Sequence, residues 1–196
     1  MIEVEWLGMR LRFSLLFPAM VVVLLMLDQS GLSAVCIAAS AMHEAGHFLA
    51  LMAFRVKPAG LTLGMFGIRV EQDAARPLCY RQNVVVSLAG PMVNLLSFAL
   101  YALCTGFSEM ACVHLVLAVF NLLPMEPLDG GQALLAFLSM KGDADRAQRI
   151  LFGVSIAVLL PLAAAGFYIL IDSGYNFSLL MVTAYLCLLV LFKRKN

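Results

Sequence analysis

Two histidines and a glutamate lie close together in the segment His43-Glu44-Ala45-Gly46-His47. On an α-helix, side chains four positions apart share one face, so both imidazoles can bind a single zinc ion. Glu44 is then placed to act as a general base toward a zinc-bound water, whose pKa the metal lowers to about 7. The motif therefore predicts a helix that carries two metal ligands, His43 and His47, with Glu44 as the catalytic residue.

The setting of this motif is apolar, because residues 32–54 contain few other ionisable side chains. A charged side chain at the centre of a transmembrane helix costs about 2.5 kcal/mol or more, and such groups are rare without a partner or a function. A pattern with three fixed positions can also arise by chance, and neighbouring helices could satisfy all three polar groups without any chemistry. The membrane setting favours a functional site over both alternatives.

A third ligand is needed, because a catalytic zinc ion usually has three protein ligands and one open position. The segment 120–132 contains two carboxylates, Glu126 and Asp129, among two prolines and two glycines that interrupt the helix. Irregular backbone at membrane depth is tolerated where it is buried or lines a cavity. At 1.5 Å per helical residue, the histidine pair and Asp129 each lie about 10–17 Å inside the same face. Glu126 remains an alternative ligand.

The composition indicates a membrane protein. Of the 196 residues, 63% are hydrophobic and 13% are charged, whereas soluble domains have about 45–50% and about 25%. The net charge of +1 gives no case for nucleic-acid binding. The five cysteines are scattered and form no metal-binding pair or disulfide framework.

Six apolar stretches are candidates for crossing the bilayer, at residues 11–27, 32–54, 83–105, 110–138, 150–171 and 177–192. Six crossings place every connection that is rich in Lys or Arg on one side, which predicts that both termini are cytoplasmic. Residues 61–70 and 2–6 are rich in strand formers. We therefore predict an all-α polytopic membrane protein of about six transmembrane helices with a small cytoplasmic β-strand element. It would form one domain over 1–196, with its core at 32–140.

Three motifs in order resemble those of the site-2 protease family of intramembrane zinc metalloproteases, peptidase family M50. The first is His43–His47, the second is Ala89-Gly-Pro-Met-Val-Asn94, and the third is Asn121 through Gly130, with its two prolines and its Leu-Asp-Gly sequence. Together they span residues 43 to 131, nearly half of the chain. The chain is most similar to the compact bacterial branch that contains the sporulation protease acting on a pro-sigma factor.

The resemblance implies that Asp129 is the third ligand of one zinc ion and that Glu44 is the catalytic acid and base. It also implies hydrolysis of peptide bonds in or near transmembrane segments of membrane-protein substrates, in a bacterial cell membrane, with the site nearer the cytoplasmic face. A membrane regulatory partner would fit this function. No CBS or PDZ domain is expected in this sequence, so regulation by ATP or by a PDZ sensor has no support, and a sporulation role cannot be assumed.

Three further polar residues have open roles. Asn94 and Asn121 could bind the substrate backbone or stabilise a developing oxyanion, or they could hydrogen-bond between helices. His114 lies near the outer end of its apolar stretch, far in depth from Glu126 and Asp129, which predicts a structural or interfacial role.

The alternative function is that of a non-catalytic zinc-binding scaffold or a transporter. A transporter would have ionisable groups along a path through the whole membrane, whereas here they are concentrated at one depth. An inactive scaffold is expected to lack the general base, and Glu44 is present.

Overall fold

The computed structural model describes residues 2–6, 9–13, 16–28, 30–56, 58–64, 67–72, 78–140 and 142–193. Over these residues the chain forms seven helices and four strands. They divide into two compact units, Met1–Phe120 and Asn121–Asn196. The prediction of one domain over residues 1–196, with its core at 32–140, stays a prediction.

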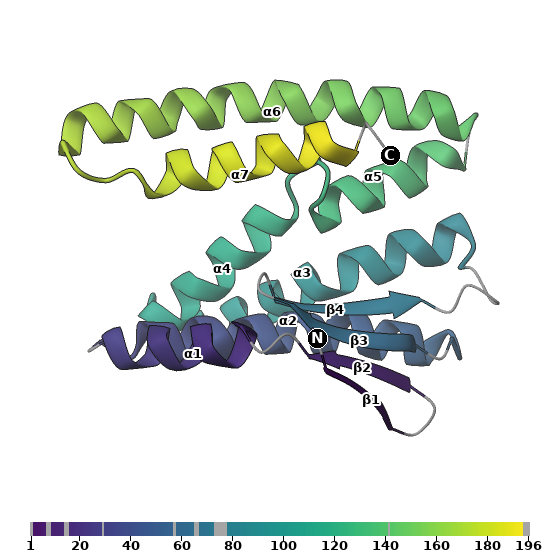
Figure 1. Ribbon diagram of the computed structural model, residues 1–196, viewed down its shortest axis with the longest axis horizontal. Coiled ribbons are helices and arrows are strands. Elements are labelled where there is room, and N and C mark those ends of the chain that lie inside the picture. Colours follow the sequence, from purple (N-terminus) through teal and green to yellow (C-terminus); the bar gives the residue numbers. More distant parts are fainter. Residues whose placement is uncertain are drawn as a thin grey trace. The chain divides into compact units, whose positions relative to one another are not determined.

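The first unit contains most of the helices that carry the predicted site: α1 (Leu16–Leu27), α2 (Leu32–Ala53), α3 (Tyr80–Thr105) and α4 (Glu109–Asn121). Helices α2 and α3 pack side by side (Figure 1). Their approach is close because Gly46 has no side chain: a Cβ there would lie 2.8 Å from the carbonyl oxygen of Ala89. Small residues at helix interfaces allow backbones to approach in this way.

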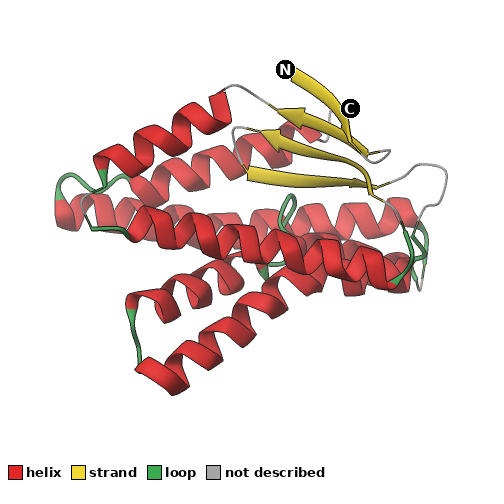
Figure 2. Ribbon diagram, turned by 90° about the horizontal axis from the view of Figure 1, so that it is seen from below, coloured by secondary structure: helices red, strands yellow, loops and turns green. Residues whose placement is uncertain are grey.

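The first unit also contains one four-stranded sheet, shown in yellow in Figure 2. Its strands, in the order in which they pair, are β1 (Ile2–Trp6), β2 (Met9–Phe13), β3 (Pro58–Gly64) and β4 (Gly67–Gln72). The two outer pairs are antiparallel, while β2 and β3 are parallel. Because parallel strands need a crossover connection, helices α1 and α2 occupy the chain between them. Strand β4 contacts α2.

The second unit is helical over its described residues, with α5 (Asp129–Ser139), α6 (Ala144–Ser173) and α7 (Ser178–Lys193). Helices α6 and α7 form an antiparallel hairpin (Figure 1). Gly174 ends α6 with φ 73°, a left-handed conformation that glycine adopts without strain. The connection that follows is short, so α7 returns along α6.

Three helices of the described chain, α2, α3 and α6, are long and apolar enough to cross a membrane. Helices α4 and α7 are apolar but shorter. Large apolar side chains are exposed along these helices, among them Leu103, which is 86% exposed. Apolar surface on this scale would not be stable in water, so the chain is an integral membrane protein.

The predicted fold class is wrong. The chain is not all-α, because it contains the four-stranded sheet, and three of its described helices, not six, have the length of a membrane span. The strands of this sheet include the segment 2–6 and overlap the segment 61–70, but the sheet also contains one further strand, Met9–Phe13. A cytoplasmic position for a strand element has no support in the structure.

Two apolar stretches account for most of the overcount of spans. Residues 110–138 form no continuous helix: α4 ends at Asn121 and α5 begins at Asp129. The stretch 11–27 is divided between the end of β2 and the 12-residue helix α1. A helix of 12 residues is about 18 Å long, shorter than the hydrocarbon core of about 30 Å.

Asp28, just before α2, illustrates how this helix begins. Its carboxylate accepts hydrogen bonds from the hydroxyl and the N–H of Ser30 and from the N–H of Ser33, at 2.6, 2.8 and 2.5 Å. The hydroxyl of Ser30 contributes most to holding the pKa of Asp28 well below its ordinary value of 3.8. Because its pKa is lowered in the folded state, the charged carboxylate stabilises the fold at every pH above the ordinary pKa. This stabilisation is lost as the pH falls below that value.

We therefore expect Asp28→Asn to lower the thermal stability of the protein slightly at neutral pH. The difference from wild type should shrink as the pH falls below about 4. Thermal unfolding in detergent between pH 3 and pH 7 measures this. A difference that is constant across this range would contradict a role for the charged carboxylate.

Candidate metal centre

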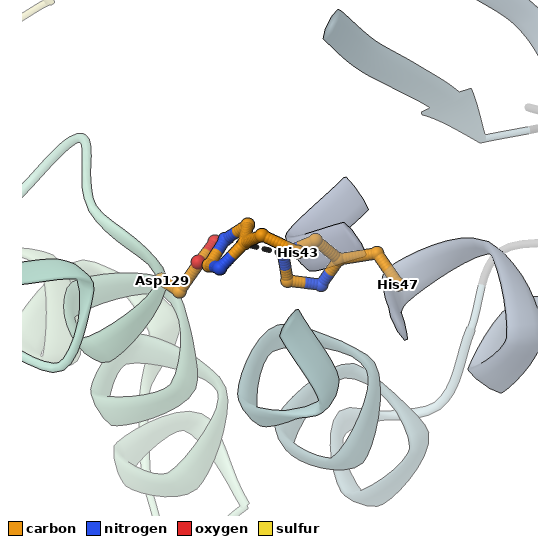
Figure 3. A group of neighbouring side chains, drawn as sticks. All are labelled: His43, His47 and Asp129. Atoms are coloured by element: carbon orange, nitrogen blue, oxygen red, sulfur yellow. Dashed lines mark hydrogen bonds between the residues drawn. The ribbon is translucent and has the colours of Figure 1, made fainter. Parts of the chain in front are cut away.

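The two histidines of the motif face each other on α2. His43 is buried and His47 is half-buried. Their Nε2 atoms are 3.2 Å apart, and their rings meet edge to face at 78° (Figure 3). Two ligand nitrogens bound to one zinc ion in tetrahedral geometry, at 2.0–2.1 Å from the metal, are separated by about 3.3 Å. The pair therefore has the spacing that a shared metal ion requires.

The other ring nitrogen of His47 fixes the chemical state of that imidazole. Nδ1 lies 2.7 Å from the carbonyl oxygen of Val86, on α3. A carbonyl oxygen can only accept, so Nδ1 carries the proton and donates it. The lone pair of His47 is then on Nε2, the atom that faces His43. This is the arrangement by which proteins orient histidine ligands of metals.

The Nδ1 atom of His43 contacts the side chain of Asn94, on α3. The amide nitrogen of Asn94 lies 3.1 Å from this atom, and the amide oxygen lies 3.2 Å from Nδ1 of His114, on α4. Asn94 has no exposed surface and His114 is 3% exposed. The ring of Tyr101 stacks on His114, with centroids 5.6 Å apart and planes at 20°. These contacts link α2, α3 and α4 through a continuous buried chain of polar groups.

Gly90 of α3 gives the imidazole pair its space. A Cβ at this position would overlap Nε2 of His47 and would lie 2.8 Å from Nε2 of His43. The two Nε2 atoms thus face bare backbone. Any side chain larger than hydrogen would collide with the imidazole pair, so the glycine of the second motif is what allows both rings to lie against α3.

In the second unit, the third motif forms a compact turn that ends in Asp129. The turn contains a cis peptide bond before Pro127, and Asp129 is half-buried at the first position of α5. The first turn of α5 packs tightly on the preceding loop: Cβ atoms at Gly130 and Gly131 would overlap the backbone carbonyls of Leu122 and Met125. The backbone that precedes Asp129 is therefore firmly held.

Glu126, the alternative carboxylate, is held in the interior of the second unit. It is 2% exposed, its backbone N–H donates to Oγ of Ser155 at 3.0 Å, and its Oε1 accepts from Nε2 of Gln148 at 2.9 Å. Both partners belong to α6. These contacts assign Glu126 a role in fixing the turn.

The first unit brings together His43, His47 and Asn94, and Glu44 follows His43 on α2, half-buried. Asn121 is the last residue of α4, and Asp129 belongs to the second unit. The roles assigned to these residues from the sequence stay predictions, both the ligand set and the substrate or oxyanion role of Asn94 and Asn121.

The sequence argument predicted a structural or interfacial role for His114 and did not connect it with the histidine pair. A depth count along a presumed single span separated this residue from the third motif, but that span is two helices, α4 and α5. A usable signal was present, because an ionisable side chain in a short apolar helix is costly unless it has a polar partner. The partner is Asn94.

Comparisons with known proteins find the family that the motifs resemble. The model of peptidase family M50 matches residues 105–162. A protein of Synechocystis sp., sll0528, described provisionally as a zinc metalloprotease, is 33% identical over 105 residues, which cover 47% of this chain and 27% of that protein. Stage IV sporulation protein FB of Bacillus subtilis is 30% identical over 135 residues, which cover 62% of this chain and 45% of that protein.

The fold has a counterpart among solved structures. The site-2 protease from Methanocaldococcus jannaschii matches with a TM-score of 0.67 and 20% identity, over 96% of this chain and 93% of that one. The matched part spans less than half the length of each of the two curated relatives. The predicted resemblance is confirmed: part of this chain matches the model of peptidase family M50, the chain is similar to these two proteins, and it shares the fold of the archaeal site-2 protease.

Proposed function

We propose that this chain is an intramembrane zinc metalloprotease that hydrolyses peptide bonds in or near transmembrane segments of other membrane proteins. The observation that carries the proposal is the imidazole pair of His43 and His47. Its Nε2 atoms are 3.2 Å apart, and Nδ1 of His47 is bound to a backbone carbonyl. The absence of a side chain at Gly90 allows the pair to lie against α3. The relation to peptidase family M50 supports the same chemistry.

The proposed ligands of the single zinc ion are His43, His47 and Asp129, the residues drawn in Figure 3. Two imidazoles and one carboxylate are a donor set that zinc accepts in catalytic sites. The choice of Asp129 over Glu126 is supported within the second unit, because Glu126 is almost fully buried and bound to Gln148. Asp129 also matches the ligand position of the third motif.

The chain's own residues supply the remaining chemistry. Zinc, when bound, acts as a Lewis acid and lowers the pKa of water to about 7. Glu44 takes the proton from the attacking water and delivers it to the leaving amine. Asn121 remains the candidate for binding the substrate backbone or a developing oxyanion. For Asn94, contacts with two histidines favour a role in holding the metal centre.

We further propose that the protein lies in a bacterial cell membrane with both termini in the cytoplasm. The site would then lie nearer the cytoplasmic face of the membrane. Arg55 follows α2 and Arg81 lies in the first turn of α3, and Lys or Arg residues mark cytoplasmic ends. His47 lies eight positions before Arg55, about 12 Å along a helix. Arg10 and Lys193 are basic residues near the two ends of the chain, which supports a cytoplasmic position for both ends.

The partners that follow are a transmembrane protein substrate, the lipid bilayer and a membrane regulatory protein. The substrate must be unwound locally, since a peptide bond inside a helix is shielded by its own hydrogen bonds. Nucleic acid is not a proposed partner, because the net charge is +1.

Removal of the metal tests the proposal. The purified full chain, reconstituted with a panel of single-span membrane proteins, should contain one zinc ion and should cleave at least one of them. Treatment with a strong chelator should reduce cleavage to background, and stoichiometric zinc should restore it. Full cleavage without zinc would refute the proposal, and zinc binding without any cleavage would favour the scaffold or transporter.

A further inference from the structure

We propose that His114 is a positioning residue of the metal centre, which acts through Asn94 to set the tautomer and orientation of His43. This inference rests on the proposed function, because it concerns the same metal site. All the residues involved belong to the first unit.

A histidine that binds a metal through Nε2 must carry its proton on Nδ1, and that proton needs an acceptor. For His47 the acceptor is the carbonyl oxygen of Val86. For His43 the group at Nδ1 is the amide of Asn94, at 3.1 Å. The amide must therefore present its oxygen to His43 when the metal is bound.

The orientation of the Asn94 amide then defines what His114 must do. With its oxygen at His43, the amide turns its NH₂ group toward Nδ1 of His114, on the other side. The structure has the opposite orientation, with the nitrogen at His43 and the oxygen at His114, and a half turn of the amide exchanges the two. Amide oxygen and nitrogen are nearly equal in size, so neither contact has to lengthen.

His114 is thus required as a hydrogen-bond acceptor at Nδ1, with its own proton on Nε2. If this acceptor is removed, the amide has no polar group to hold its NH₂ in place. Asn94 has no exposed surface and His114 is 3% exposed, so bulk water does not replace the lost partner. The stacked ring of Tyr101 holds the plane of His114 and directs Nδ1 at the amide.

Two substitutions of His114 separate its hydrogen bond from its ring. His114→Phe keeps an aromatic ring to stack on Tyr101 but has no acceptor. His114→Asn loses the ring but places an oxygen close to the position of Nδ1. The zinc affinity of the purified full chain is measured by competition with a chelator, and the environment of the metal by the visible spectrum of a cobalt derivative. Cys112→Ser, an exposed change on the same helix, serves as the control.

We expect His114→Phe to weaken zinc binding about 10–100-fold and to alter the cobalt spectrum, as loss of an outer partner of a ligand does. His114→Asn should bind zinc within a few fold of wild type, as should the control. A purely structural role of the ring gives the reverse order, with Phe tolerated and Asn harmful. That order would overturn the inference.

Asn94→Leu provides an independent test should His114→Phe not fold. It removes the link itself and should weaken zinc binding at least as much, so a wild-type affinity would also overturn the inference. The proposed function fails in a different way. In that case the wild-type chain itself binds no zinc, or it binds zinc and cleaves nothing. Wild-type binding and cleavage together with an unaffected His114→Phe variant would refute the positioning role alone.

Discussion

Glu44→Gln is expected to abolish peptide-bond cleavage and to leave zinc bound. Glutamine has nearly the shape of glutamate but cannot accept a proton from the attacking water. General acid–base catalysis contributes about 10²–10⁴-fold to the rate, and the loss should appear in kcat. The substitution leaves both imidazoles of α2 and their partners Val86 and Asn94 unchanged, so zinc affinity should stay within a few fold of wild type.

The measurement is the rate of product formation from a single-span substrate, together with the zinc content of each protein. Glu109→Gln is the matched control, because it makes the same chemical change at an exposed carboxylate in the first turn of α4. That variant should cleave at the wild-type rate. Equal rates for the Glu44 and Glu109 variants would end the assignment of Glu44 as general base.

The part of the site that could be predicted from the sequence is the part that local spacing defines. Residues 43 and 47 share a face of any helix, so the imidazole pair required only that residues 32–53 be helical. The structure shows in addition that Gly90 accommodates the imidazole pair. The sequence could not show this, because it depends on how α2 and α3 are aligned.

The elements that the sequence could not predict depend on contacts between distant segments. Residues 110–138 have the composition of one long span, yet the prolines and the packed glycines of the third motif end α4 and restart the chain as α5. The pairing of β2 with β3 joins segments about 50 residues apart. Strand-forming residues indicate that strands exist, but the alternation pattern contains no information on which strands are neighbours.

The role of Asn94 shows the same limit at the level of one side chain. Residue type allows an asparagine in a transmembrane helix to bind substrate or to bridge helices. The contacts with His43 and His114 favour the bridge. Neither contact follows from sequence spacing, because the three residues lie on three different helices.

Gly90→Ala is expected to eliminate high-affinity zinc binding, and cleavage with it. The added Cβ would overlap Nε2 of His47 and press on Nε2 of His43. Withdrawal of α3 would be unfavourable, because it would break the close packing of Gly46 of α2 against the carbonyl oxygen of Ala89. The imidazoles must therefore rotate away, and the 3.2 Å spacing of their Nε2 atoms is lost. Overpacking of this kind costs about 1–3 kcal/mol of stability, so the variant should still fold.

Zinc affinity should fall by more than about 100-fold, beyond the 10–100-fold loss that removal of an outer partner of a ligand causes. Zinc titration against a chelator measures this, and thermal unfolding in detergent shows whether the fold persists. Gly153→Ala is the matched control, because a Cβ on that glycine of α6 meets no atom within 4 Å. Alanine is the better helix former by about 0.5–1 kcal/mol, so the control should be slightly more stable and fully active. If Gly90→Ala bound zinc as tightly as this control, the close fit of the imidazole pair against Gly90 would not matter for metal binding.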